Sequence, residues 1–170
     1  MKISRTSLIQ APADEVWRVL GPNFADAYTW ASSIDLSKGR SGPGPAGAPC
    51  AGRVCDTELG KFQETLEVYD EIERQLSYTA QGEKMPFFVR RMHNAWTVTP
   101  EGADASRVNM TLTVDLAFPF NLLMGLPMRL QLGGVLRKVH EELKYYVEHD
   151  GAPHPRKIEA IRRAGLPAGA

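Results

Sequence analysis

The hydrophobic period of the chain changes at Pro12, and this change constrains the fold more than any other local feature. Before Pro12, residues 3–9 alternate roughly between apolar and polar side chains, which predicts a half-buried strand. After it, Asp14 and Glu15 occupy positions where the positive end of a helix dipole favours carboxylates. The residues on or beside the apolar face of this helix are Val16, Trp17, Val19 and Leu20. The start of the chain therefore predicts a strand that leads directly into a short helix.

Length and charge limit the class of protein. With 170 residues, of which 43% are hydrophobic, the chain suits one domain with a substantial core. Its 20 basic and 20 acidic side chains cancel, so we expect no nucleic-acid partner and no attraction to an anionic membrane. No segment approaches the ~20 apolar residues of a membrane span, and residues 1–10 lack the apolar region of a signal peptide. We therefore expect a cytoplasmic protein without integral membrane association.

Two breaks follow the first helix. Gly21–Pro22 ends it, and residues 23–28 could form a second short helix with Asn23 as its N-cap. Residues 39–49 (GRSGPGPAGAP) carry glycine or proline at most positions, which predicts a mobile surface loop. Residues 42–47 match GxGxxG, but two prolines remove amides that would bind a phosphate, so we reject a dinucleotide site.

The middle of the chain has the period of two that is typical of strands. In the clearest case, residues 107–116 alternate apolar and polar side chains over most of the segment. The turn at residues 100–104 (PEGAD) suits a hairpin to the preceding strand. The strands predicted after the glycine-rich loop are 53–57, 61–72, 75–80, 90–99 and 107–116.

The period returns to that of a helix near residue 121. Apolar side chains from Met124 to Val147 recur at helical spacing and charges fill the remaining face, which predicts one long amphipathic helix over residues 121–149. Pro127 and Gly133–Gly134 are points at which this helix could bend or begin late. We place the single domain at residues 1–149 and expect residues 150–170 to form a tail that is partly helical or loosely attached.

The order of these elements has a family resemblance. Three phrases, IQAPADEVWRVLG, LSYTAQG and WTVTPEGADASRVNMTLTVDL, precede the amphipathic helix. With the element order, they resemble the START-like helix-grip superfamily (SRPBCC), which includes polyketide cyclase/dehydrase-like proteins and lipid-transfer domains. The resemblance covers roughly residues 2–149.

This resemblance implies an α+β helix-grip fold. A curved antiparallel sheet of about six to seven strands would wrap around the long C-terminal helix, with two short helices after the first strand. The resemblance also implies an internal cavity for an apolar or aromatic molecule. Elementary packing leads to the same two layers, because the apolar face of the sheet and that of the helix must be buried against each other.

Glu64 is the first candidate for this cavity. If Leu66 and Val68 face inward, the same alternation points Glu64 inward, where an ionised carboxylate needs a partner, a raised pKa or solvent. Arg90 could be that partner, or could bind an anionic ligand, if it shares a face with Trp96. The alternative for Glu64 is a structural ion pair or a wet strand edge.

Tyr78 is the best candidate for a hydroxyl inside the cavity, because a buried tyrosine normally finds a partner for its polar end. If the protein is an enzyme, Glu64 and Tyr78 are the candidates for proton transfer. Trp96 could instead pack in the core, where aromatic side chains are common. The residues that we expect to bind the ligand are Trp30, Phe62, Glu64, Tyr78, Phe88, Arg90, Asn94, Trp96, Met110, Met124, Met128 and Leu132.

The remaining chemistry-bearing residues predict neither a metal site nor a cofactor. Cys50 and Cys55 have neither CxxC nor metal-quartet spacing and are expected to be buried thiols. His93 stands alone on the strand face opposite Asn94. The other three histidines lie on or beyond the last helix, without a partner at metal spacing.

Two apolar loops and the glycine-rich loop complete the set of candidate features. Residues 85–88 (MPFF) and 118–124 (FPFNLLM) could mark a ligand entrance, or could pack on each other to close the end of the domain. The loop at residues 39–49 resembles the pocket rim of some helix-grip proteins.

Three functions follow from these observations. The leading hypothesis is the binding or carriage of a hydrophobic or aromatic small molecule in the cavity between sheet and helix. The first alternative is a cyclase, dehydrase or aromatase that acts on a polyketide-like substrate. The second alternative is a protein-interaction module, and a homodimer is one form that it could take.

Overall fold

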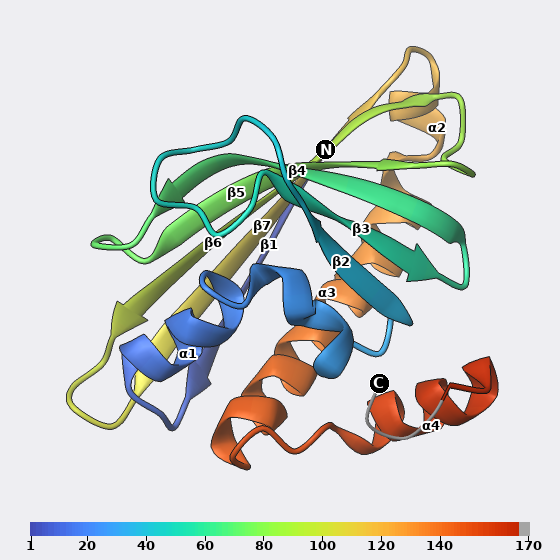
Figure 1. The fold of residues 1–170 in the computed structure, drawn as a ribbon. Helices are drawn as coiled ribbons and strands as arrows, with labels where there is room; N and C mark the ends of the chain where they lie inside the picture. The colour runs from blue at the N-terminus through green and yellow to red at the C-terminus, as the bar shows by residue number, and fades with distance from the viewer. Residues whose placement is uncertain (167–170) are drawn as a thin grey trace.

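The computed structural model describes residues 1–166 and forms one antiparallel sheet with helices on one side. The seven strands follow the order β1-β7-β6-β5-β4-β3-β2, so the first two strands of the chain lie at opposite edges. Figure 1 shows the long helix α3 against one face of the sheet, with α1 near one end of the strands and α2 at the other. This two-layer α+β arrangement confirms the predicted fold class.

The first strand and the first helix match the change of period at Pro12. Strand β1 (Lys2–Ile9) pairs with β7 along its whole length, and α1 (Ala13–Leu20) begins directly after Pro12. Both carboxylates of its first turn are exposed, in positions where the helix dipole stabilises them. The side chains that α1 buries are Ala13, Val16, Trp17 and Leu20.

The segment after α1 differs from its prediction in two details. The second short helix, η1 (Phe24–Thr29), is a 3₁₀ helix, and the side chain of Asn23 makes no capping hydrogen bond. Strand β2 (Leu36–Arg40) includes two residues of the expected loop, because its pairing with β3 extends to Arg40 opposite Gly52.

The other strands lie close to their predicted positions. Two irregularities, between Leu66 and Val68 and between Val89 and Arg91, shift the register along the strands. As a result Val68 is 45% exposed and Arg90 is exposed, so the expectation that both face inward is wrong. The bounds of these strands are β3 (Gly52–Thr57), β4 (Gly60–Asp70), β5 (Gln75–Gly82), β6 (Val89–Pro100) and β7 (Ser106–Leu116).

The long helix begins later than predicted. A short helix, α2 (Phe120–Leu123), comes first, and α3 (Gly125–Glu148) follows after Met124, with Pro127 in its first turn. Proline is tolerated there because the first amides of a helix lack partners within the helix. The C-terminal half of α3 supplies its buried side chains, which are Leu136, His140, Glu142 and Leu143.

The chain beyond α3 includes a packed helix. Helix α4 (Pro155–Ala164) begins at His154, whose side chain accepts a hydrogen bond from the amide of Arg156. Lys157 is 1% exposed, and its Nζ donates to the carbonyl oxygen of Ile34 at 2.6 Å. Residues 155–164 of the expected tail are therefore helical and held against the domain, whereas residues 167–170 lie outside the described residues.

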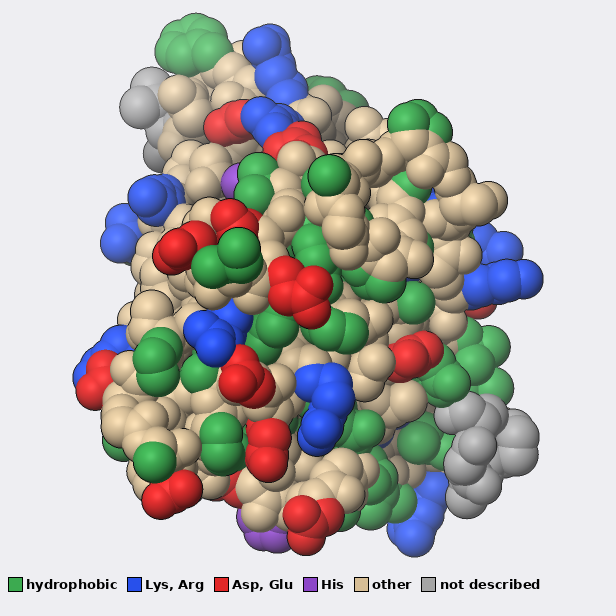
Figure 2. Space-filling model, turned by 60° about the vertical axis from the view of Figure 1, so that its left-hand side comes forward, with side chains coloured by type: hydrophobic (Ala, Val, Ile, Leu, Met, Phe, Trp, Pro, Cys, Tyr) green, Lys and Arg blue, Asp and Glu red, His purple; other side chains and the backbone are tan. Residues whose placement is uncertain are grey.

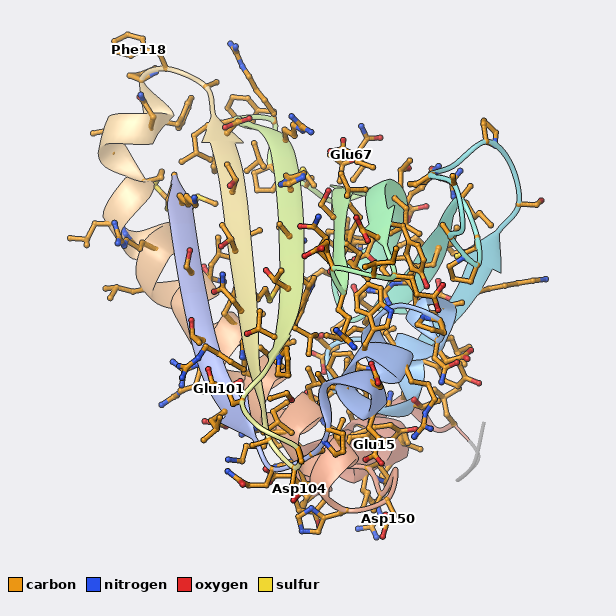
Figure 3. All side chains as sticks on the ribbon, turned by 90° about the vertical axis from the view of Figure 1, so that its left-hand side faces the viewer. Glu15, Glu67, Glu101, Asp104, Phe118 and Asp150 are labelled. Carbon is orange, nitrogen blue, oxygen red and sulfur yellow. The ribbon has the colours of Figure 1, made fainter. Side chains whose placement is uncertain are left out.

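The surface agrees with the charge balance of the sequence. Figure 2 shows basic and acidic side chains interspersed over one face of the molecule, with hydrophobic side chains among them. Figure 3 shows Phe118 at one end of the domain and Asp104 and Asp150 at the other. Within residues 1–166, no helix is long and apolar enough to cross a membrane.

Candidate functional site

A cavity of about 540 Å³ lies between the inner face of the sheet and α3. Side-chain alternation on β5, β6 and β7 turns one row of residues from each strand toward this space. The apolar residues that line it from the sheet are Phe62, Leu76, Ala80, Met92, Trp96, Met110 and Leu112. Those that line it from α3 are Leu132, Val135, Leu136 and Val139.

A buried ion pair lies at the wall of the cavity. Arg53 on β3 stands directly opposite Glu64 on β4, and Arg53 Nε donates to Glu64 Oε2 at 2.5 Å. The same guanidinium donates to the carbonyl oxygen of Phe24 and lies 4.1 Å from the centre of its ring. Burial by itself would lower the pKa of Arg53, but the charge of Glu64 opposes burial and the net pKa lies above its usual value.

Two other ionisable residues beside this pair are held in their neutral forms. Burial, reinforced by the charge of Glu64, raises the pKa of Tyr78 and raises that of Cys55 to about 12. The Tyr78 ring packs edge-on against Phe24 at 5.3 Å between centroids. At neutral pH the cavity wall therefore presents a protonated phenol and a protonated thiol.

Charged residues gather where α4 and the β3–β4 turn approach the cavity. Arg163 on α4 and Glu58 in the turn both line it, and Arg163 NH1 donates to Glu58 Oε1 at 3.0 Å. Lys138 on α3 lines the same cavity. Both members of the Arg163–Glu58 pair are well exposed, which assigns them to the outer part of the cavity.

Most of the residues predicted to bind a ligand come together at this cavity. Glu64 is 9% exposed and Tyr78 is 6% exposed, and both lie on its wall. The ion partner of Glu64 is Arg53 and not Arg90, which the register shift at β6 leaves at the surface. The predicted residues that line the cavity are Trp30, Phe62, Glu64, Tyr78, Asn94, Trp96, Met110 and Leu132.

Three other predicted residues lie away from the cavity. Phe88 stacks on Phe120 at 4.8 Å between ring centroids, so the two apolar loops pack on each other. Met124 separates α2 from α3 and is 36% exposed. Met128 is half-buried and packs against the core outside the cavity lining.

The glycine-rich loop also lies outside the cavity lining that the described residues form. A Cβ added at Gly44 would meet the Cα of Ala51 at 3.0 Å, so the loop packs closely on the chain just before β3. The turn at Thr57–Leu59 lines the cavity in its place. The expectation that the loop at residues 39–49 forms the rim is therefore wrong.

The sequence interpretation missed Arg53, Phe24 and Arg163. A signal existed for Arg53, because period-two alternation puts it on the same strand face as Cys55, and a charged residue on an apolar face needs a partner. Arg163 had no such signal, since its place depends on how α4 packs on the domain.

A sheet whose inner face and long helix enclose a lined cavity defines the class of helix-grip proteins with an internal binding space. The chain belongs to the polyketide cyclase/dehydrase and lipid transport family, whose model matches residues 1–148. Helix α4 lies beyond this match. No match to this sequence is found among curated proteins.

Solved structures support the same fold. A START superfamily protein from Mycobacterium smegmatis superposes with a TM-score of 0.68 at 18% identity, covering 86% of this chain and 97% of its own. The di-domain ARO/CYC BexL has a TM-score of 0.70 at 16% identity, with 87% of this chain and 46% of BexL covered. Norcoclaurine synthase from Thalictrum flavum, in complex with dopamine and hydroxybenzaldehyde, has a TM-score of 0.66 at 18% identity, covering 88% and 87%. At these identities the likeness establishes the fold alone.

Proposed function

We propose that the protein binds and carries a hydrophobic small molecule in the cavity between the sheet and α3. The observation that carries this proposal is the cavity itself, because about 540 Å³ lined mainly by apolar side chains lies within the range of roughly 300–1,000 Å³ found for ligand pockets. Burial of an apolar ligand would supply the affinity. The family description includes lipid transport, which agrees with this function.

The chemistry of the cavity wall favours carriage over catalysis. General acid–base catalysis is most efficient when the catalytic pKa lies near the working pH. Burial moves the pKa values of Tyr78 and Cys55 upward, away from neutrality. Glu64 is already engaged by Arg53. These groups are therefore suited to orienting a ligand more than to transferring protons.

Ligand binding is tested with a neutral fluorescent probe, N-phenyl-1-naphthylamine, and a pair of matched variants. Ala80→Leu adds volume inside the cavity, whereas Ala95→Leu adds the same volume on the other face of the sheet. We expect the wild type and Ala95→Leu to bind the probe and Ala80→Leu to bind it at least tenfold more weakly with an unchanged Tm. Absence of binding to the wild type, or equal binding by both variants, would overturn the proposal.

Native mass spectrometry on protein purified gently from its own host gives a second test. A copurifying small molecule that leaves the wild type on unfolding, and that is missing from Ala80→Leu, supports carriage. The same preparation identifies the ligand for later measurements.

A cyclase-type enzyme is the second candidate, because Glu64 and Tyr78 line one cavity and the fold resembles that of BexL. Once a copurifying ligand is known, turnover is measured with the wild type and Tyr78→Phe, which keeps the ring that packs on Phe24. A conversion that depends on the Tyr78 hydroxyl would favour the enzyme. Stoichiometric binding without conversion would favour the carrier.

A further inference from the structure

The cavity wall contains two polar atoms that no described residue satisfies. Among residues 1–166, six buried side-chain nitrogen or oxygen atoms lack a hydrogen-bond partner. Two of them, Trp30 Nε1 and Asn94 Oδ1, belong to side chains that line the cavity. Trp30 is 5% exposed and Asn94 is 6% exposed. Buried polar groups normally have partners, so these two are expected to find theirs in what the cavity holds.

The position of each residue explains why the protein itself offers no partner. Asn94 lies in the middle of β6, with Tyr78 and Leu112 as its cross-strand neighbours, on the row of residues that faces the cavity. Trp30 follows η1 on the helical side of the same space. An amide in such an apolar row stabilises nothing in the core by itself, because leucine would pack there without a desolvation penalty.

We propose that Trp30 and Asn94 form a polar subsite that binds a neutral oxygen-bearing group of the ligand, a hydroxyl or a carbonyl. The indole N–H donates to the ligand oxygen, and the Asn94 amide accepts from a hydroxyl or donates to a carbonyl, since an amide offers both functions. One ligand oxygen or two can meet these groups. This inference rests on the proposed function and narrows the class of ligand.

The charges around the cavity argue against an ionised group in this subsite. The cation inside the cavity wall, Arg53, is already neutralised by Glu64 and also donates to the carbonyl of Phe24. A carboxylate beside Asn94 would lose its hydration without gaining a free cation from the described inner wall. Hydrogen bonds to a neutral group need no such compensation.

The test compares naphthalene, 2-naphthol and 2-naphthoate as displacers of N-phenyl-1-naphthylamine at neutral pH. These probes share one apolar body and differ in a single group. For the wild type we expect 2-naphthol to bind about tenfold more tightly than naphthalene, which corresponds to about 1.4 kcal/mol, and more tightly than 2-naphthoate. Equal binding of naphthol and naphthalene by the wild type would overturn the subsite and leave the proposed carrier function intact.

Two variants assign the preference to the residues. Trp30→Phe keeps an aromatic ring without the N–H, and Asn94→Leu keeps the shape without the amide. In each variant the ratio of naphthalene to naphthol Kd should fall toward one, while naphthalene itself binds at least as tightly as to the wild type. A misfolded variant would instead lose all three probes, and the ratio is then measured in the milder Asn94→Ser.

Control variants remove the same groups elsewhere. Trp17 Nε1 is also buried and unpaired among the described residues, but Trp17 does not line the cavity, so Trp17→Phe should keep the tenfold ratio. Asn109, which accepts from Thr6 on the other face of the sheet, provides the amide control Asn109→Leu. A ratio that survives in Trp30→Phe or Asn94→Leu, or that falls equally in the controls, contradicts the proposal. Failure of every probe to bind would instead contradict the carrier function.

Discussion

Arg53 and Glu64 face each other across β3 and β4 and form an ion pair that the rest of the domain covers. Their side chains are 7% and 12% exposed, and Nε lies 2.5 Å from Oε2. Neither residue can lose its partner without leaving a charge in an apolar wall, because water does not reach the pair freely.

We predict that Glu64→Gln destabilises the protein by about 3–5 kcal/mol, since it leaves the Arg53 guanidinium uncompensated. The double variant Arg53→Met with Glu64→Leu removes both charges and should recover most of this loss. Urea unfolding measures both values. The exposed pair Arg91–Glu67 is the control, because its side chains are 49% and 36% exposed and Glu67→Gln should cost less than about 1 kcal/mol. Equal losses for Glu64→Gln and Glu67→Gln would contradict the role of burial.

The thiols give a prediction that reports on the cavity wall. Cys55 is 1% exposed and burial raises its pKa to about 12, whereas Cys50 is partly exposed. Because the thiolate is the reactive form, a thiol reagent should modify Cys50 readily and Cys55 only after unfolding. Cys50→Ser should abolish the fast phase of labelling. A fast phase that persists in Cys50→Ser would mean that Cys55 is open to solvent.

Periodicity predicted the elements better than it predicted the inward faces. Residues 107–116 form an unbroken alternation, and Val108, Met110, Leu112 and Val114 are all buried as expected. On β4 the alternation holds through Leu66 and fails at Val68, because the pairing with β5 shifts between them. Such a shift depends on the neighbouring strand and leaves no mark in the hydrophobic pattern of one segment. Arg90 was misplaced for the same reason.

Long-range contacts explain what the sequence could not supply for the site. Glu64 was recognised as a charge that needs a partner, but the choice between Arg53 and Arg90 depends on which strand lies beside β4. Trp30 and Asn94 were found because of their residue type and their place in the pattern. Their shared lack of a partner could be seen only when the cavity was assembled.

Helix α4 gives a prediction about the attachment of the C-terminal segment. Glu142 is 1% exposed and accepts hydrogen bonds from Ser32 N, Ser32 Oγ and Arg156 Nε, the last at 2.9 Å. Arg156→Met removes one charged partner from this buried carboxylate and should lower the free energy of unfolding by about 1–3 kcal/mol. It should also speed proteolysis between residues 150 and 155. Arg163→Met, which breaks the exposed pair with Glu58, is the matched control and should cost less than about 1 kcal/mol. A smaller effect for Arg156→Met than for Arg163→Met would contradict this attachment.

His140 predicts how stability depends on pH. The ring is 1% exposed, stacks on Trp96, and lies 2.8 Å from Ser7 Oγ through Nδ1. Burial, with a smaller effect from the charge of Arg5, lowers the pKa of His140 to about 4 from its usual 6.5. Because the unfolded chain then binds the proton more tightly than the folded chain, the stability is fully present above pH 6.5 and is lost as the pH falls toward 4.

The loss attributable to His140 should reach about 3 kcal/mol at the acid end of this range, since one pKa unit corresponds to about 1.4 kcal/mol. Carboxylates titrate in the same range, so the measurement is the difference between variants in urea unfolding at several pH values. His140→Gln keeps a polar group near Ser7 and cannot titrate, so its stability should fall less steeply with acid than that of the wild type. His149 is exposed, and His149→Gln should keep the wild-type slope. Parallel curves for His140→Gln and the wild type would mean that the folded protein accepts a proton on His140 as readily as the unfolded chain does.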